Sequence, residues 1–214
     1  MQVFILGAQK IKGWFLSNDS SVLVKKLISG KSFLDWNINS LNEKGIKHDS
    51  ISLIAGHKFK EIQKSIPKIN YIVNPKWEHT HVVGSVRHAL DYWNGEDLLI
   101  FYADTLFKPN ALKEFINLCT ENLIATSDVS SDNYNFRHKK PKEEILQLKN
   151  NYYKNFKKTE ITKPKHFSGL TFLKKETVKK FKLLLEKSNN SLDNLRFSNA
   201  LDELIKLDSK IKFK

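Results

Sequence analysis

The seven residues Asp97–Ala103, with the sequence DLLIFYA, form an almost wholly apolar run that Asp104 follows directly. A strand that is apolar on both faces is typical of a parallel sheet covered on both sides. In such sheets, ligands bind outside the carboxyl ends of the strands. The segment therefore predicts a central buried strand, and it places Asp104 at the edge of the sheet where ligands bind.

Short apolar runs and stretches with helical spacing alternate on either side of this segment. The other predicted strands of the first part of the chain are Gln2–Gly7, Ile51–Ala55, Ile69–Val73 and Asn122–Ser127. The predicted helices are Ser32–Lys44, Lys58–Ser65, Ser85–Trp93 and Pro109–Cys119. This alternation indicates an α/β fold with a mostly parallel sheet and right-handed crossovers.

The pattern changes from about residue 130. Residues 132–165 are polar, basic and aromatic, and His166–Leu173 then alternates like a strand. Helices are expected at Glu176–Glu186 and Leu192–Ile205, and a last short strand at Lys210–Phe213. No repeat or low-complexity linker divides the 214 residues.

The net charge of +13 is concentrated in this second part of the chain. Between Arg137 and Lys182 there are fourteen Lys and one Arg against four Glu. Such a block could attract nucleic acid, an anionic membrane or a polyphosphate, or it could be a solvated Lys-rich surface. Because Lys outnumbers Arg and no zinc-finger or RNA-recognition signature is present, we favour the solvated surface and expect no nucleic-acid partner.

The cysteine content and the apolar runs bear on the compartment. A single cysteine, Cys119, excludes an intramolecular disulfide framework and a Cys-rich zinc site, and it is expected to be buried in a helix. No run approaches the roughly 18 apolar residues of a membrane span. The apolar stretch near the start is too short for a signal peptide. We expect a cytoplasmic protein without a membrane span.

Asp104 is the first candidate for a functional residue, and it has two interpretations. A carboxylate at the end of a buried strand can hold Mg²⁺ that bridges the phosphates of a nucleotide. Alternatively, Asp104 is a turn residue, because Asp104-Thr105 opens the next loop. For an isolated Asp, residue type alone favours the turn.

Loops at two other strand ends are also candidates. Gly7 lets the backbone turn close to a phosphate, although neither a dinucleotide fingerprint nor a P-loop motif is present. After Ile69–Val73, we expect Ser85 to cap a helix whose N-terminal amides suit an anionic ligand. In the same loop, Trp77 either packs on a substrate or anchors the loop.

Four motifs, taken in order, resemble the nucleotidyltransferases that activate sugar phosphates or phosphocholine with an NTP. They are Ile54-Ala55-Gly56-His57-Lys58, Asn74-Pro75-Lys76-Trp77, Gly84-Ser85-Val86 and Ala103-Asp104. The phosphocholine cytidylyltransferase-like subgroup is the most similar, and MobA-like transferases are broader relatives. The resemblance covers Met1 to about Phe115 well and the rest of the chain loosely.

The resemblance implies a Rossmann-like α/β fold of the nucleotide-diphospho-sugar transferase type, in a single domain over residues 1–214. Residues 1–129 would form the nucleotide-binding half, and residues 130–214 a basic, acceptor-side half. A phosphate monoester such as a sugar phosphate or phosphocholine would attack the α-phosphate of an NTP, with CTP or UTP favoured, and release pyrophosphate. Such an enzyme would be cytoplasmic and serve cell-surface polysaccharide biosynthesis.

The resemblance also implies a set of site residues. Asp104 would ligate Mg²⁺, and Lys25 or Lys26 would match the catalytic lysine that precedes Gly30-Lys31. The nucleotide-binding residues would be Leu6, Gly7, Ala8, Thr80, Gly84 and Ser85. The contribution of the enzyme would be mostly alignment and charge neutralisation.

The chain departs from the family pattern in two places. The first loop has no Arg and no Pro, so Lys10 or Lys12 would have to replace the Arg as a point charge. The late acidic residue that serves as second metal ligand is missing where the sequence reaches Lys210–Lys214. Three interpretations stay open: a piece of a longer protein, a variant chemistry, or a non-catalytic nucleotide-binding relative.

A glycosyltransferase-like protein that uses nucleotide sugars is a further alternative. Those enzymes typically carry Asp-x-Asp at the metal-binding strand. Here that position reads Asp104-Thr105-Leu106, which favours the nucleotidyltransferase.

Overall fold

The computed structural model describes residues 1–10, 22–24, 30–107, 110–128, 145–146, 165–207 and 211–213. The strands are β1 (Gln2–Gly7), β2 (Ile51–Ala55), β3 (Asn70–Val73), β4 (Leu98–Tyr102), β5 (Leu123–Asp128), β6 (Ile145–Leu146), β7 (Lys165–Leu173) and β8 (Lys212–Phe213). The helices are α1 (Phe33–Asn42), α2 (Phe59–Ser65), α3 (Val82–Leu90), α4 (Ala111–Asn117), α5 (Lys175–Lys187) and α6 (Phe197–Leu207), with short 3₁₀ turns η1 (Val22–Val24) and η3 (His48–Ser50).

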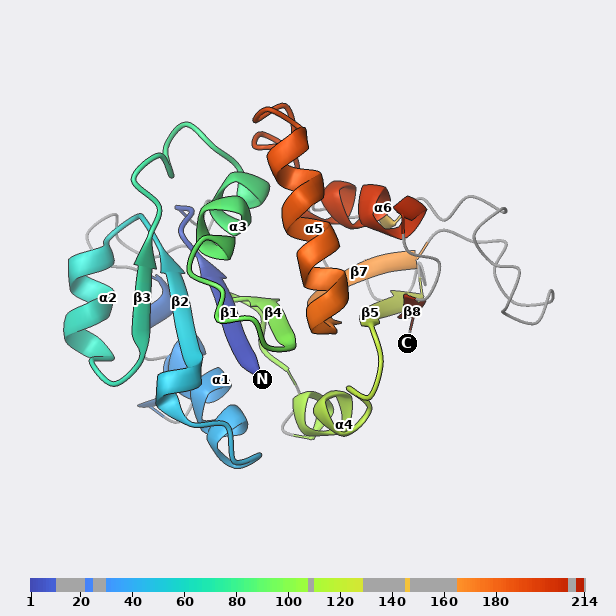
Figure 1. The fold of residues 1–214 in the computed structure, drawn as a ribbon. Helices are drawn as coiled ribbons and strands as arrows, with labels where there is room; N and C mark the ends of the chain where they lie inside the picture. The colour runs from blue at the N-terminus through green and yellow to red at the C-terminus, as the bar shows by residue number, and fades with distance from the viewer. Residues whose placement is uncertain are drawn as a thin grey trace.

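One sheet runs through the described part of the molecule in the order β3-β2-β1-β4-β7-β5-β8, with β6 paired to β7 (Figure 1). The pairs β1–β2, β1–β4, β2–β3 and β5–β8 are parallel, whereas β7 is antiparallel to β4, β5 and β6. The prediction of a mostly parallel sheet with Asp97–Ala103 at its centre is therefore confirmed. The position of β7 between β4 and β5 was not predicted.

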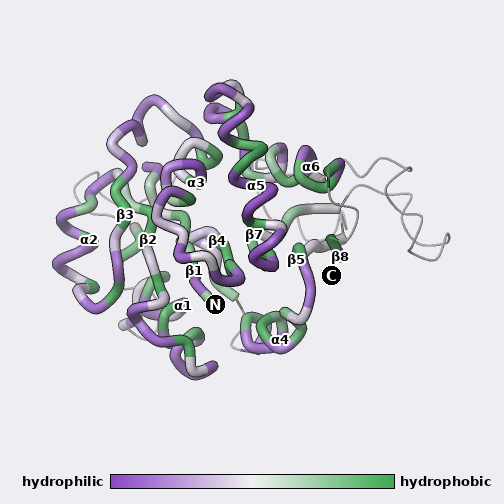
Figure 2. Tube along the Cα trace, viewed as in Figure 1, coloured by the Kyte–Doolittle hydropathy of each residue, from purple (hydrophilic) through white to green (hydrophobic). Residues whose placement is uncertain are grey.

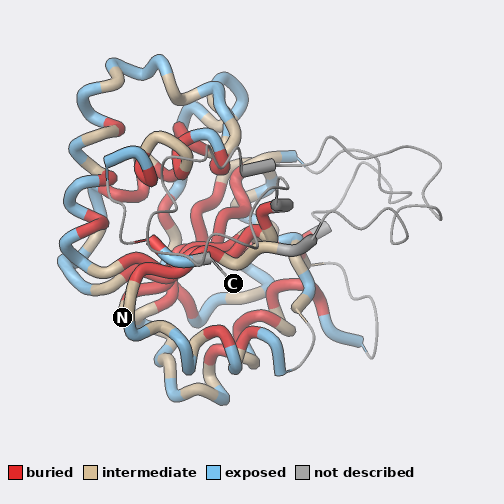
Figure 3. Tube along the Cα trace, turned by 90° about the vertical axis from the view of Figure 1, so that its right-hand side faces the viewer, coloured by how far each residue is buried: buried red, intermediate tan, exposed pale blue. Residues whose placement is uncertain are grey.

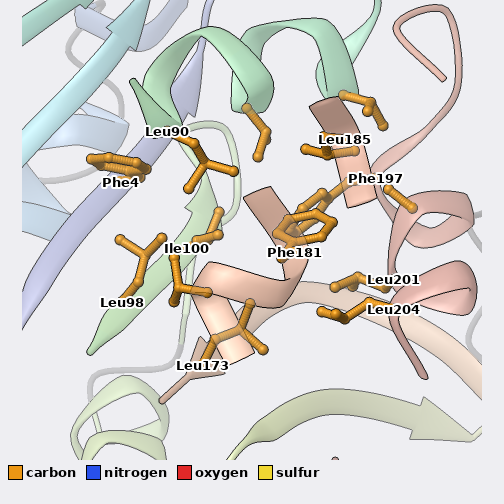
Figure 4. Packing of buried hydrophobic residues seen from close by; sticks show 14 of the residues in the cluster. Phe4, Leu90, Leu98, Ile100, Leu173, Phe181, Leu185, Phe197, Leu201 and Leu204 are labelled. Carbon is orange, nitrogen blue, oxygen red and sulfur yellow. The ribbon is translucent and has the colours of Figure 1, made fainter. Parts of the chain in front are cut away.

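Helices cover both faces of the sheet, which explains why its central strands are apolar throughout. In β1, Phe4 and Leu6 join a cluster under α3, α5 and α6, whereas Val3 and Ile5 join a cluster under α1, α2, α4 and η1. Figure 4 shows the first cluster, in which Phe181 and Phe197 meet between the two C-terminal helices and the sheet.

The helices themselves are amphipathic, as expected for helices that pack on a sheet with one side and face solvent with the other. Hydrophilic and hydrophobic residues alternate along α5 (Figure 2), and its buried residues are Thr177, Val178, Phe181 and Leu185. Buried residues accordingly lie along the strands and the inner sides of the helices (Figure 3).

Two predicted helix starts are wrong by three or more residues. The helix predicted from Ser85 begins at Val82, and the helix predicted from Leu192 begins at Phe197. In α1, by contrast, the predicted start is correct: Ser32 is the N-cap and forms a capping box with Asp35. The start of α1 was predictable because its capping box lies within four consecutive residues. The start of α3 has no side-chain cap of this kind.

Candidate functional site

A cleft of about 210 Å³ opens at the carboxyl ends of β1 and β4. The described residues that line it come from the ends of these strands, η1 and the start of α3: Leu6, Gly7, Ala8, Gln9, Leu23, Val82, Ser85, Tyr102 and Asp104. This is the edge of an α/β sheet at which ligands bind. The cleft is therefore the candidate site.

Five of the residues proposed from the sequence line this cleft, namely Leu6, Gly7, Ala8, Ser85 and Asp104. Thr80 and Gly84 are not among its lining residues. Thr80 packs closely on Gly84, and a Cβ added to Gly84 would lie only 2.6 Å from the Cβ of Thr80. The two candidate lysines, Lys25 and Lys26, lie outside the described residues.

Four lining residues were missed by the sequence reasoning: Gln9, Leu23, Val82 and Tyr102. Gln9 directly follows the predicted Leu6–Ala8 segment, and Tyr102 lies two residues before Asp104, so proximity in sequence could have indicated both. Leu23 and Val82 carry no such signal, because an apolar side chain near a loop is indistinguishable from a core residue.

The first loop follows β1 through a narrow space at Gly7. A Cβ on Gly7 would lie 2.9 Å from Cδ1 of Leu23 and 3.2 Å from Cβ of Ala103. Main-chain hydrogen bonds hold the loop on both sides: the Ala103 amide donates to the carbonyl of Leu6 at 2.9 Å, and the His57 amide to that of Ala8 at 2.8 Å. The loop is thus fixed to the ends of β4 and β2, and Asp104 lies immediately beside it.

Asn74, at the end of β3, connects the next loop to α3. It is buried, its Nδ2 donates to Oγ1 of Thr80 at 3.1 Å and to Oγ of Ser85 at 3.0 Å, and its Oδ1 accepts from the Lys76 amide at 2.9 Å. Both ends of the amide are therefore satisfied. The Ser85 hydroxyl, which accepts from Asn74, belongs to a residue that lines the cleft.

The interpretation of Ser85 as a helix cap is wrong. Ser85 lies inside α3, and the residue at the N-cap, His81, makes no side-chain capping hydrogen bond. The carbonyl of Asp193, from the turn between α5 and α6, instead accepts from the amides of His81 and Gly84 at 2.8 and 3.3 Å. Two amides at the observed start of α3 are therefore occupied by the protein.

An ion pair fixes the same turn on α3. Nε of Arg87 lies 2.9 Å from Oδ1 of Asp193, and Nη2 of Arg87 donates to Oγ of Ser188 at 2.7 Å. The guanidinium also donates to Oδ1 of Asn190. The C-terminal helices thus support the wall of the cleft that α3 forms.

Trp77 anchors its loop on the end of β2. A Cβ on Gly56 would lie 2.5 Å from Cγ of Trp77 and 2.7 Å from the Ala8 carbonyl, so Gly56 lies directly beneath both. The ring of His57 meets the Trp77 ring edge-on, with centroids 5.4 Å apart. Burial, and then the nearby charges of Lys10 and Lys58, lower the pKa of His57 below its ordinary value.

On the opposite side of the cleft, β7 is irregular beside Tyr102. Gly169 has a φ of +78°, and a Cβ there would lie 2.8 Å from Cδ2 of Tyr102. The pairing of β5 with β7 shifts register between Ile124 and Thr126, so the ladder is interrupted beside Gly169. The loop after Asp104 is fixed separately, because Nδ2 of the buried Asn37 donates to the Thr105 carbonyl at 3.1 Å.

A second cavity, of about 270 Å³, lies at the amino ends of β2 and β3, and we call it the amino-end cavity. Its lining residues come from α1, η3 and the segment that joins α2 to β3: Asp35, Ile38, Asn39, Asn42, His48, Ser65, Ile66, Pro67, Lys68 and Ile69.

Other chemistry considered from the sequence has no support in the described residues. They contain no cluster of three or more His, Cys, Asp or Glu residues that could hold a metal ion. Cys119 is partly buried, burial raises its pKa to about 12, and its Sγ donates to the Phe115 carbonyl at 3.2 Å.

Over the described ranges, no helix has the length and apolar character that crossing a membrane requires.

No protein-family model matches the sequence. Three solved structures are similar in fold. A Bacillus anthracis protein assigned as a glucose-1-phosphate thymidylyltransferase has a TM-score of 0.69 at 11% identity, over 100% of this chain and 85% of the other. The CTP:phosphocholine cytidylyltransferase from Streptococcus pneumoniae has a TM-score of 0.65 at 14% identity, over 100% and 88%.

The third is the inositol-1-phosphate CTP transferase from T. maritima, with a TM-score of 0.65 at 15% identity over 99% of this chain and 84% of the other. All three match nearly the whole chain, so the similarity includes the region after residue 130 that the sequence resemblance covers only loosely. At these identities the likeness concerns the fold. The chain has the mixed, mostly parallel sheet of the nucleotide-diphospho-sugar transferase fold.

Proposed function

We propose that the protein is a nucleotidyltransferase that transfers a nucleoside monophosphate from an NTP to a phosphorylated small molecule and releases pyrophosphate. The observation that carries the proposal is the position of Asp104: a carboxylate that lines the cleft directly beside the first loop. A nucleotide whose phosphates lie along Leu6–Ala8 would have them within reach of a cation held by Asp104. The fold neighbours support the same kind of reaction.

Mg²⁺ is the cation we propose. Magnesium sites that serve nucleotides commonly use one or two carboxylates and complete their shell with substrate phosphates and water. Asp104 is the acidic residue among the described lining residues of the cleft, so this donor set fits such a site. When bound, the ion would neutralise phosphate charge as the transfer proceeds.

The reaction requires alignment more than covalent chemistry. An oxygen of the acceptor phosphate forms a bond to the α-phosphorus, the bond from that phosphorus to the bridging oxygen breaks, and pyrophosphate leaves. We propose that Lys25 or Lys26 neutralises charge on the α-phosphate, while the main chain of Leu6–Ala8 lines the nucleotide. The turn interpretation of Asp104 is the competing one, and it predicts no role for this carboxylate.

We propose CTP or UTP as the nucleotide, and a sugar phosphate or phosphocholine as the acceptor. The preference for a pyrimidine nucleotide rests on the resemblance to the phosphocholine cytidylyltransferase-like subgroup, and two of the fold neighbours use CTP. The hydroxyl of Ser85, which accepts from Asn74, could donate a hydrogen bond to a pyrimidine carbonyl.

The test is pyrophosphate release with each of the four NTPs and MgCl₂, over a panel of sugar phosphates and phosphocholine. We expect release that requires both an acceptor and a pyrimidine nucleotide. Nucleotide binding without release would indicate a non-catalytic relative. Release of a nucleoside diphosphate from nucleotide sugars would indicate the glycosyltransferase-like alternative and overturn the proposal.

A further inference from the structure

Gln9 extends from the first loop to the loop that follows β3. Its Nε2 donates to the carbonyl oxygen of Trp77 at 3.0 Å and to that of Thr80 at 2.7 Å. Because both partners are acceptors, only the nitrogen of the amide can face them, so the partners determine the orientation of the group. Both amide hydrogens are used, and the two loops are joined at two points three residues apart.

This contact belongs to the wall of the cleft. Gln9 is a lining residue, whereas Trp77 and the underlying Gly56 are not. Thr80, which accepts from Gln9, also accepts through its hydroxyl from Asn74, and Asn74 in turn holds Ser85. A continuous series of hydrogen bonds therefore runs from the first loop to the start of α3.

We propose that Gln9 is a positioning residue that fixes the separation between the first loop and the wall formed by Val82 and Ser85. The inference rests on the proposed function, because it requires one nucleotide to contact the first loop at one end and the wall of Val82 and Ser85 at the other. A ligand that spans both walls binds more tightly when they are held in place beforehand, since it does not have to order them. Without Gln9, the carbonyls of Trp77 and Thr80 lose a donor, and the loop is held less firmly by its other contacts, chiefly the packing of Trp77 on Gly56.

Two substitutions separate the length of the side chain from its ability to donate. Gln9→Met keeps the length and the apolar stem but has no donor. Gln9→Glu keeps the shape but places a carboxylate against two carbonyl oxygens, so it should open the loop further. Gln63→Met, at an exposed position of α2, is the matched control.

Hydrogen exchange of the segment 75–81 measures the loop without any ligand, and titration with CTP or UTP in the presence of MgCl₂ measures affinity. For Gln9→Met we expect the amide exchange rate of this segment to rise about tenfold. The dissociation constant of the nucleotide should rise about tenfold as well, as loss of two hydrogen bonds implies. Gln9→Glu should exceed Gln9→Met in both measurements. Gln63→Met should change neither.

The outcomes are distinguishable. Unchanged exchange in Gln9→Met overturns the inference whatever the nucleotide does. Faster exchange with unchanged nucleotide affinity means that the contact only stabilises the fold, which also overturns it. If the wild-type protein binds none of the four nucleotides, the proposed function fails and takes the assignment of the two walls with it, whereas the exchange result still decides whether Gln9 holds the loop.

Discussion

The cleft at the carboxyl ends of the strands and the amino-end cavity have similar volumes, about 210 and 270 Å³, yet they are built differently. The cleft is lined by the main chain that follows β1, the start of α3 and the carboxylate of Asp104. In the amino-end cavity, polar side chains serve the fold: Oδ2 of Asp35 accepts from the Ser32 amide at 2.9 Å, and Nδ2 of Asn42 lies 2.9 Å from Nε2 of His48.

The direction of the chain, more than the volume of a cavity, sets which edge of the sheet gathers polar groups from separate loops. Parallel strands all deliver their next residues to the same edge, so polar groups from separate loops meet there. At the opposite edge, the chain arrives from helix ends and turns, and its polar groups cap those elements. Removing the charge of an aspartate at the two edges should therefore have opposite consequences.

The largest expected difference is between Asp104→Asn and Asp35→Asn. If Asp104 holds Mg²⁺, Asp104→Asn should lower turnover on the order of 10²-fold or more, because asparagine lacks the charge that binds the ion. Its free energy of unfolding should change by less than about 0.5 kcal/mol, as is usual for an exposed position. Steady-state pyrophosphate release and urea denaturation measure the two quantities.

Asp35→Asn should show the reverse pattern. It weakens the capping box of α1, so about 0.5–1 kcal/mol of stability should be lost while turnover of the folded protein is unchanged. An Asp104→Asn protein with wild-type turnover would identify Asp104 as a turn residue and remove the main support for the proposed reaction.

A smaller difference is expected between Asn74→Ala and Asn42→Ala. Asn74 is buried and makes three hydrogen bonds, so its loss leaves buried polar groups without partners and should cost about 1–3 kcal/mol. Asn42 is partly exposed, so water can replace its bond to His48 and the cost should stay below about 1 kcal/mol. Urea denaturation of both variants with equal m values checks this order, and equal losses would contradict it.

The smallest effect concerns pH at the cleft edge. The pKa of His57 is lowered in the folded protein, chiefly by burial, below the 6.5 of an ordinary histidine. As pH falls below about 6.5, the unfolded chain therefore binds a proton first, and the free energy of unfolding decreases. His57→Gln should lose this part of the pH dependence. Denaturation series between pH 5 and 8 test it, and identical slopes for both proteins would show that His57 does not contribute.

Much of the fold could be predicted because local patterns encode it. After Asp97, the run DLLIFYA is apolar on both faces, which is typical of a strand between two helical layers. The candidate site was predicted in part for the same reason: Gly7 ends β1 and Asp104 follows β4, and the carboxyl ends of these parallel strands lie at one edge. The start of α3 could not be predicted, since its first amides are satisfied by the carbonyl of Asp193, more than a hundred residues away in sequence.

Sequence patterns alone are enough to identify the main strands, the strand ends that bear polar groups, and the mostly parallel character of the sheet. These follow from side-chain periodicity and from the rule that crossovers return a strand in the same direction. Only the tertiary structure decided that β7 enters between β4 and β5 and that Gln9 joins two loops about seventy residues apart in sequence. Both depend on contacts between distant segments, and periodicity within a segment carries no information about its partner.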